Sequence, residues 1–235
     1  TVICEGKSKS VPSAVGWHPK NITFSPKPQT SVCVNKITGF VFCNYPLFVE
    51  KGYAATRSEE VAAKAGVSKG TLFLYFPSKE ELFKAVVREN VVKTVNEGAL
   101  EVANFKGSCS ELLKTLMMEW WRRYGATKAS GITKLISNEA HHFPDLAAFY
   151  QEEVIDPATR LLQDILERGR ATGEFHDFDT THTATVVIAP MLFLIMSKNT
   201  YGICLSGSDQ TTPENLIAQH ADLIVRGLCT NPKTQ

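Results

Sequence analysis

Residues 52–83 read GYAATRSEEVAAKAGVSKGTLFLYFPSKEELF, and this stretch carries the strongest local pattern of the chain. Apolar residues at helical spacing predict two short helices, over residues 57–64 and 68–76, with Gly66 between them. Glycine takes the left-handed conformation of a tight turn without a Cβ penalty. Two short helices joined by such a turn form a helix-turn-helix.

Capping residues mark where the helices of this motif begin. Thr56 followed by Glu59, and Ser78 followed by Glu81, each fit the capping box, in which two helix N–H groups are satisfied reciprocally. Ser68 is placed to cap the second short helix. A further helix is therefore expected directly after the motif.

The exposed first turn of the second helix carries Lys69, Gly70 and Thr71. Helix-turn-helix proteins insert this turn into the major groove of DNA. Lys69 can reach base edges or phosphates, Gly70 allows close backbone approach, and Thr71 can bond a base or touch a thymine methyl. Tyr75 offers a hydroxyl to phosphate. Lys79 adds its charge to the first N–H groups of the next helix, which together predict an anion site.

The rest of the chain after Pro46 is expected to be all-α, because apolar residues at helical spacing alternate with short breakers and strand alternation is not evident. Pro157 and Pro190 fall inside expected helices and should kink or break them. Thr212 should cap the last helix. The helices predicted after the motif span residues 78–95, 108–125, 127–140, 144–171, 179–202 and 213–229.

Composition is that of an ordinary soluble protein, with 43% hydrophobic and 21% charged residues. The apolar run over residues 186–196 is shorter than the roughly 18 residues that a membrane span needs, and a secretory signal is not evident. Six scattered cysteines without a CxxC pair favour free thiols in a reducing cytoplasm.

Charge is distributed unevenly along the chain. Residues 1–93 contain 13 Lys and Arg and 7 Asp and Glu, whereas the residues from 94 on contain 12 Lys and Arg and 17 Asp and Glu. Only the first part is therefore expected to meet a polyanion.

The motif resembles the DNA-binding domain of the TetR family of bacterial transcriptional regulators. The shared pattern includes the pairs at residues 47–48 and 52–53 and the run AGVSKGTL over residues 65–72. The sequence departs from the family at Phe73, where the family usually has Tyr, and upstream, where Pro46 should end or kink the first helix. The resemblance implies DNA contacts from Thr56, Arg57, Lys69, Gly70, Thr71, Phe73, Tyr75 and Lys79.

The resemblance also implies a three-helix domain with the helix-turn-helix, followed by a helical bundle for ligand binding and dimerisation. The expected domains are an atypical segment over residues 1–46, the DNA-binding head with its linking helix over 47–93, and the effector domain over 94–235. The first segment holds a distorted first helix or is not the native N-terminal sequence. A homodimer should be held by the helices near 179–202 and 213–229, given their apolar content: Val186, Val187, Leu192, Ile195, Ile217, Ile224 and Leu228.

The expected function is a ligand-responsive regulator, in the repressor form, that binds a pseudo-palindromic operator in the cytoplasm. Its effector is expected to be a small apolar or aromatic molecule. The residues that could line the effector pocket, although at helical spacing such residues are more often core, are Met117, Trp120, Trp121, Tyr124, Phe143, Phe149 and Tyr150.

Neither a cofactor nor a metal is expected, since the adjacent His141 and His142 point in different directions on a helix. Two other functions stay open. One is an interaction or ligand-binding helical protein with an impaired DNA-binding head. The other is an enzyme that uses the helical pocket, which the sequence disfavours because it lacks a glycine-rich phosphate loop, a nucleophile elbow and an HExxH motif.

Overall fold

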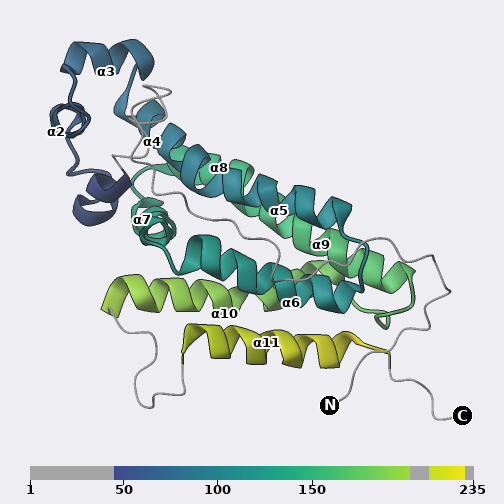
Figure 1. Cartoon of the computed structure of the whole chain (residues 1–235). Helices are drawn as coiled ribbons and strands as arrows, with labels where there is room; N and C mark the ends of the chain where they lie inside the picture. Colours follow the sequence, from purple (N-terminus) through teal and green to yellow (C-terminus); the bar gives the residue numbers. More distant parts are fainter. Residues whose placement is uncertain (1–44, 202–211, 231–235) are drawn as a thin grey trace, which may run out of the picture.

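The computed structural model describes residues 45–201 and 212–230, and this part of the chain is all-α, as predicted (Figure 1). Apart from an isolated bridge between Phe175 and Cys229, the described ranges contain no strand. Residues 45–51 are helical. The α-helices that follow are α2 (Ser58–Lys64), α3 (Lys69–Tyr75), α4 (Lys79–Val87), α5 (Lys93–Asn104), α6 (Cys109–Trp120), α7 (Gly131–Glu139), α8 (Pro144–Tyr150), α9 (Asp156–Ala171), α10 (Thr180–Tyr201) and α11 (Pro213–Leu228).

Short π-helical segments join several of these helices into longer rods. Segment η1 (Arg88–Val92) joins α4 to α5, η2 (Trp121–Gly125) extends α6, and η4 (Gln151–Ile155) joins α8 to α9. The helix predicted over residues 78–95 therefore continues to Asn104. Pro157 does not break its rod, which continues from η4 into α9 with the proline as the second residue of α9.

Helix α10 continues through Pro190, so this proline does not end it either. By length and composition α10 could cross a membrane, although its longest apolar run is too short on its own. The core helices of soluble proteins pass the same test but are mostly buried, whereas 33% of this span is buried in the described structure. Here α10 packs against α7, α9 and α11, and both Val187 and Ile195 are completely buried.

Pro46 lies within the helical residues 45–51. Phe48, two residues further on, is completely buried and packs edge-on against Phe83 of α4. The prediction that Pro46 ends or kinks a longer helix concerns residues 1–44, which lie outside the described part of the chain.

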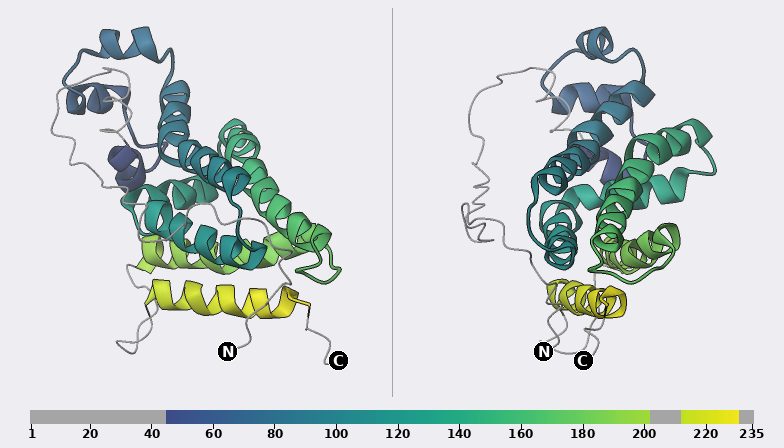
Figure 2. Two further views of the ribbon diagram at one scale, coloured as in Figure 1. Left: turned by 45° about the vertical axis from the view of Figure 1, so that its right-hand side comes forward. Right: turned by 90° about the vertical axis from the view of Figure 1, so that its right-hand side faces the viewer.

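The helices form a head, a body and an outer layer. Helices α2 and α3 project at one end, and the α4–η1–α5 rod leads from this head across the body (Figure 1). Helix α11 lies along α6 and α10 as the outermost element, which the views in Figure 2 show from two sides. A continuous apolar core connects head and body.

Several local predictions are confirmed. The side chains of Ser68, Ser78 and Thr212 each accept a hydrogen bond from the backbone N–H three residues further on, as N-caps do. Gly66, between α2 and α3, has a φ of 71°, in the left-handed region.

The cysteines differ from the expectation of six free thiols. Cys109 is a buried free thiol, and burial raises its pKa. Cys229 is disulfide-bonded, so for this residue the expectation is wrong. Cys4, Cys33, Cys43 and Cys204 lie outside the described residues.

Candidate DNA-binding head and ligand pocket

Helix α3 offers an accessible surface at the tip of the head (Figure 1). Its first turn is held by Ser68, whose Oγ accepts from the Thr71 N–H at 3.0 Å and lies 2.8 Å from the Thr71 hydroxyl. Leu72 is the buried residue that anchors the helix, whereas Leu74 is 83% exposed. Lys69, Gly70, Phe73 and Tyr75 are exposed as well. The capped first turn and its exposed side chains suit insertion into a DNA groove.

Lys69 is paired within the head. Its Nζ lies 2.6 Å from Oε1 of Glu59 on α2 and 5.7 Å from the centre of the Phe73 ring. The hydrogen bond from Lys69 also lowers the pKa of Glu59. Because both side chains are largely exposed, such a pair contributes little stability. Lys69 can therefore exchange Glu59 for a phosphate.

Lys79 forms hydrogen bonds within the head. Its Nζ donates to the backbone carbonyls of Tyr53, Ala54 and Thr56 at 3.0, 3.2 and 3.2 Å, and it lies 4.6 Å from the centre of the Tyr53 ring. The predicted anion site, in which this charge joins the first N–H groups of α4, is not the arrangement observed. The ammonium instead satisfies carbonyls in the turn before α2.

Thr56 is also part of the scaffold. The predicted capping box is wrong, since Arg57 is the N-cap of α2 and makes no side-chain cap. The Thr56 side chain is buried, and its hydroxyl donates to the Gly52 carbonyl at 2.7 Å. Any effect of Thr56 on DNA binding must therefore act through this turn, whereas Arg57 is exposed.

The body contains a narrow pocket between α5, α6, α9 and α10, with an accessible cavity volume of about 60 Å³. Its wall is apolar, with Trp120 on one side and Leu161 and Ile188 facing it from other helices. The further lining residues are Thr94, Val95, Gly98, Glu101, Leu116, Met117, Glu119, Arg123, Ala158, Leu162 and Met191.

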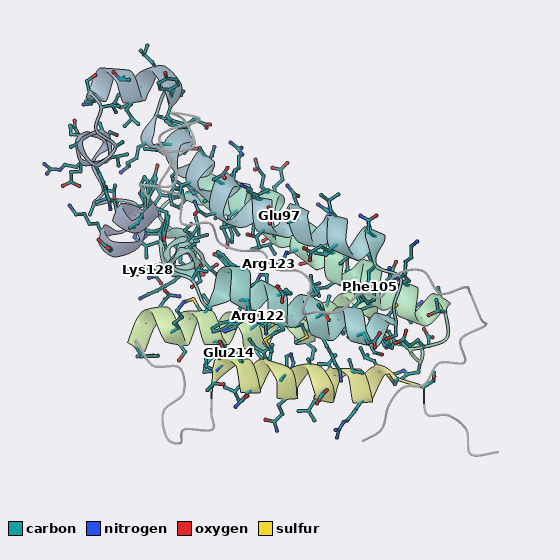
Figure 3. The ribbon with its side chains drawn as sticks, in the orientation of Figure 1. Glu97, Phe105, Arg122, Arg123, Lys128 and Glu214 are labelled. Atoms are coloured by element: carbon teal, nitrogen blue, oxygen red, sulfur yellow. The ribbon has the colours of Figure 1, made fainter. Side chains whose placement is uncertain are left out.

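Charged side chains bridge α5 and α6 at the mouth of this pocket. Arg123 of η2 places Nη1 2.6 Å from Oε1 of Glu101 and Nε 3.3 Å from Oε2 of Glu119. Figure 3 shows Arg123 between the two helices. Arg122 also pairs with Glu119, with Nη1 2.9 Å from Oε1, so two arginines balance the two carboxylates of this cluster.

Two of the seven predicted ligand residues, Met117 and Trp120, line the pocket. Trp121 points away from it, with its indole N–H donating to Glu214 of α11 at 2.8 Å. The hydroxyls of Tyr124 and Tyr150 lie 2.6 and 3.0 Å from that of Thr133. Burial raises the pKa of both tyrosines. These three predicted residues belong to the core.

The last two predicted ligand residues join the body to the head. The Phe143 ring packs edge-on against Tyr53 of the head, with centres 4.7 Å apart. Phe149 lies beneath two cations of the α4–η1 rod, Lys84 at 5.6 Å and Arg88 at 5.0 Å. They are interdomain contacts that the helical pattern alone could not distinguish from pocket residues.

An apolar face remains open along α10 and α11. Phe193 is 59% exposed and Leu223 is 62% exposed, and both line a groove between the two helices. Of the residues predicted to hold a dimer, Val186 and Leu192 are exposed and Ile224 is half-buried. The others are already buried within the protomer, which corrects that part of the prediction: Val187, Ile195, Ile217 and Leu228.

Within residues 45–201 and 212–230, no group of three or more His, Cys, Asp or Glu side chains gathers as a metal site. His141 and His142 lie in the turn after α7.

Two family models match this chain, one in the head and one in the body. A family model described as bacterial regulatory proteins of the tetR family matches residues 46–86, and a model described as a tetracyclin repressor-like C-terminal domain matches residues 106–200. The first model covers the head and the second covers most of the body.

Matches to curated proteins are strongest in the head. The chain is 52% identical over 42 residues to the HTH-type transcriptional regulator RutR of Escherichia coli (strain K12), covering 18% of this chain and 20% of RutR. The chain thus spans about a fifth of the length of that relative. The HTH-type transcriptional repressor NicS of Pseudomonas putida is matched over 191 residues at 23% identity, covering 77% of this chain and 87% of NicS.

Solved structures share the whole fold. The fatty acid degradation regulator FadR of Bacillus halodurans matches with a TM-score of 0.68 at 21% identity, over 81% of this chain and 94% of that one. FadR of Bacillus subtilis, solved in complex with stearoyl-CoA, matches with a TM-score of 0.68 at 18% identity, over 81% of this chain and 98% of that one.

Proposed function

Because the chain belongs to the tetR family of bacterial regulatory proteins, we propose that it is a transcriptional regulator that binds a pseudo-palindromic operator as a homodimer and responds to a small apolar effector. The observation that carries this proposal is the head. A capped and exposed α3 is held against α2 by a left-handed glycine and a buried leucine. The proposed reading head with its linking helix is residues 47–93, and the effector and dimerisation part is residues 94–235.

In the head, the proposed contacts divide into two groups. Lys69, Gly70 and Thr71 on the first turn of α3 face the bases, and Arg57 and Tyr75 serve the phosphate backbone, with Phe73 beside them. Thr56 and Lys79 act indirectly, since both hold the turn that precedes α2.

The effector site is the pocket between α5, α6, α9 and α10. Support comes from its apolar wall and from the Bacillus subtilis FadR of the same fold, which was solved with stearoyl-CoA. A ligand there would separate or rotate helices that continue into the head through η1, and such coupling typically amounts to about 1–3 kcal/mol. The similarity to NicS, a transcriptional repressor by its printed name, supports the repressor form of this function. We propose a cytoplasmic protein without an enzymatic activity of its own.

The dimer is proposed to form through the exposed face of α10 and α11, with Phe193 and Leu223 at its centre. Packing two helices from each protomer makes a four-helix contact, which covers this face and fixes the distance between the two heads. Recognition helices of such dimers lie about 34–36 Å apart, one turn of DNA.

The test is a titration of the purified chain with the DNA that flanks its own gene and with random duplexes, at several salt concentrations. We expect binding to the flanking DNA with a steep salt dependence. Thr71→Ala should cost about 1–3 kcal/mol on the preferred site and less on random DNA. Leu74→Ala, at an exposed position of the same helix, is the control for a general effect of substitutions in α3. Binding that stays equal for flanking and random DNA in all variants would contradict the proposal and favour an interaction protein with an impaired head.

A further inference from the structure

The carboxylate of Glu59 lies beside the recognition helix at the tip of the head (Figure 1). Glu59 stands in the first turn of α2, and its Oε1 is 2.6 Å from Nζ of Lys69, in the first turn of α3. The Glu59 side chain is 58% exposed. Since the first turn of such a helix enters the major groove, the ion pair brings a negative group to the surface that meets a polyanion.

This carboxylate needs a new donor when DNA binds. If Lys69 leaves Glu59 for a phosphate, Glu59 loses its main hydrogen-bond donor and stands near phosphates of its own sign. The major groove offers two exocyclic amines as donors, N4 of cytosine and N6 of adenine. The adenine amine lies between two acceptors, its own N7 and O4 of thymine, which repel a carboxylate. The cytosine amine has one such neighbour, O6 of guanine, so a carboxylate fits cytosine better.

Resting on the proposed function of the head, we propose that Glu59 is a specificity-determining residue that accepts a hydrogen bond from the N4 amine of one cytosine in each half-site. On other sequences the carboxylate finds no such donor and competes with the DNA for Lys69. Glu59 therefore favours the operator and weakens binding to random DNA. Base reading then involves α2 as well as the first turn of α3.

Glu60 provides a matched control on the same turn of α2. Its Oε1 lies 2.9 Å from Nζ of Lys51, which precedes α2 and is not part of the recognition helix. Acidic residues in a first turn also stabilise the helix dipole. Glu59→Gln and Glu60→Gln each remove one such charge, so a role in the helix alone gives the same result for both.

The experiment uses the full chain and the site in its flanking DNA that it protects from nuclease. Each base pair of both half-sites is replaced symmetrically by the other three, and affinities are measured at one salt concentration together with a random duplex. In the unaltered chain we expect one position where cytosine is favoured by at least about fivefold for each half-site, the effect of one mismatched base pair.

Glu59→Gln should move the preference at this position to adenine, because glutamine bonds N6 and N7 of that base. It should also tighten binding to random DNA by up to about fivefold, the contribution of an exposed ion pair. Glu60→Gln should keep the cytosine preference and affect all duplexes alike. Thermal unfolding should give equal midpoints for the two variants, which shows that α2 stays folded in both.

Three results would each overturn this inference: a cytosine preference absent from the unaltered chain, one that Glu59→Gln leaves unchanged, or one that Glu60→Gln removes equally. Titration of the unaltered chain decides the proposed function separately. If this chain prefers the flanking DNA to random DNA and Glu59→Gln retains every base preference, only the inference about Glu59 fails.

Discussion

Arg88 of η1 and Glu153 of η4 form a bidentate ion pair. It links the α4–η1–α5 rod, which begins in the head, to the body. Nε of Arg88 lies 2.8 Å from Oε2 of Glu153, and Nη2 lies 2.5 Å from Oε1. The guanidinium also covers the Phe149 ring. Two parallel hydrogen bonds fix direction as well as distance, so this pair helps set how the head is held on the body.

We expect Arg88→Met to weaken operator binding by up to about fivefold, since the pair is partly exposed and such pairs contribute at most about 1 kcal/mol. The head would then lose part of its fixed orientation while remaining folded. Operator affinity and the urea midpoint of unfolding are the two measurements.

Lys93→Met is the control for this variant, because Lys93 pairs with Glu89 one turn away on the same rod. Exchanging the charges, with Arg88→Glu and Glu153→Arg together, should restore part of the operator affinity. If Arg88→Met binds operator as tightly as Lys93→Met and the unaltered chain do, the pair does not orient the head.

A second prediction separates the two lysines of the head. Lys69→Ala should lower the salt dependence of operator binding by about one unit for each phosphate that it no longer neutralises, because Lys69 can exchange Glu59 for a phosphate. Lys79→Met should instead lower the stability of the head, since three carbonyls are deprived of their donor, at about 0.5–1.5 kcal/mol per hydrogen bond. Salt titrations and thermal unfolding of both variants measure the difference.

Lys64→Ala, in the exposed last turn of α2, is the charge-matched control. A Lys79→Met chain with unchanged stability and a reduced salt dependence would show that Lys79 contacts phosphate directly, as its place at the start of α4 would allow.

The local features of the head could be predicted from sequence because short-range chemistry determines them. Ser68 and Ser78 cap helices through groups only three residues away, and Gly66 takes a conformation that other residues adopt rarely. Thr56 is the exception. Its hydroxyl bonds the Gly52 carbonyl in the preceding turn, a partner that depends on how residues 52–56 fold.

The direction of each aromatic side chain in the body could not be predicted in the same way. Trp120 and Trp121 are neighbours in sequence, yet one lines the pocket and the other bonds Glu214 on α11. Apolar residues occur on more than one side of α6, so the pattern marks the helix without saying which partner each side meets. Packing between distant helices decides that. The same reason explains why some residues predicted to hold the dimer are not available for it: Val187 and Ile195 are buried in the core of the chain itself.

The third prediction concerns the proposed dimer. Phe193→Glu and Leu223→Glu together should give a monomer at micromolar concentration, because each places a charge in a face that the partner would cover. Sedimentation velocity measures the mass. Leu100→Glu is the control, since Leu100 is 66% exposed on α5, away from this face. A dimer that persists in the double variant would place the interface elsewhere.

The last prediction follows from His176, whose two ring nitrogens both lie beside carbonyl oxygens. Nδ1 is 2.8 Å from the Asp177 carbonyl and Nε2 is 2.7 Å from the Gly227 carbonyl at the end of α11. Only the protonated ring can donate to both, and these two hydrogen bonds raise the pKa of His176 above its usual 6.5. A raised pKa stabilises the folded form fully below pH 6.5, and the contribution is lost as the pH rises through the folded value.

The end of α11 should therefore open more readily at pH 9 than at pH 6. Hydrogen exchange of the Thr230 N–H, which bonds the Glu174 carbonyl, reports this opening after correction for intrinsic rates. His176→Ala should exchange faster at pH 6 and lose the pH dependence. His182→Ala is the control, because His182 is exposed at the start of α10 and pairs with Asp179 instead. If the corrected exchange of the unaltered chain is the same at both pH values, the imidazolium does not hold α11, and its contact with Gly227 is made by the neutral ring.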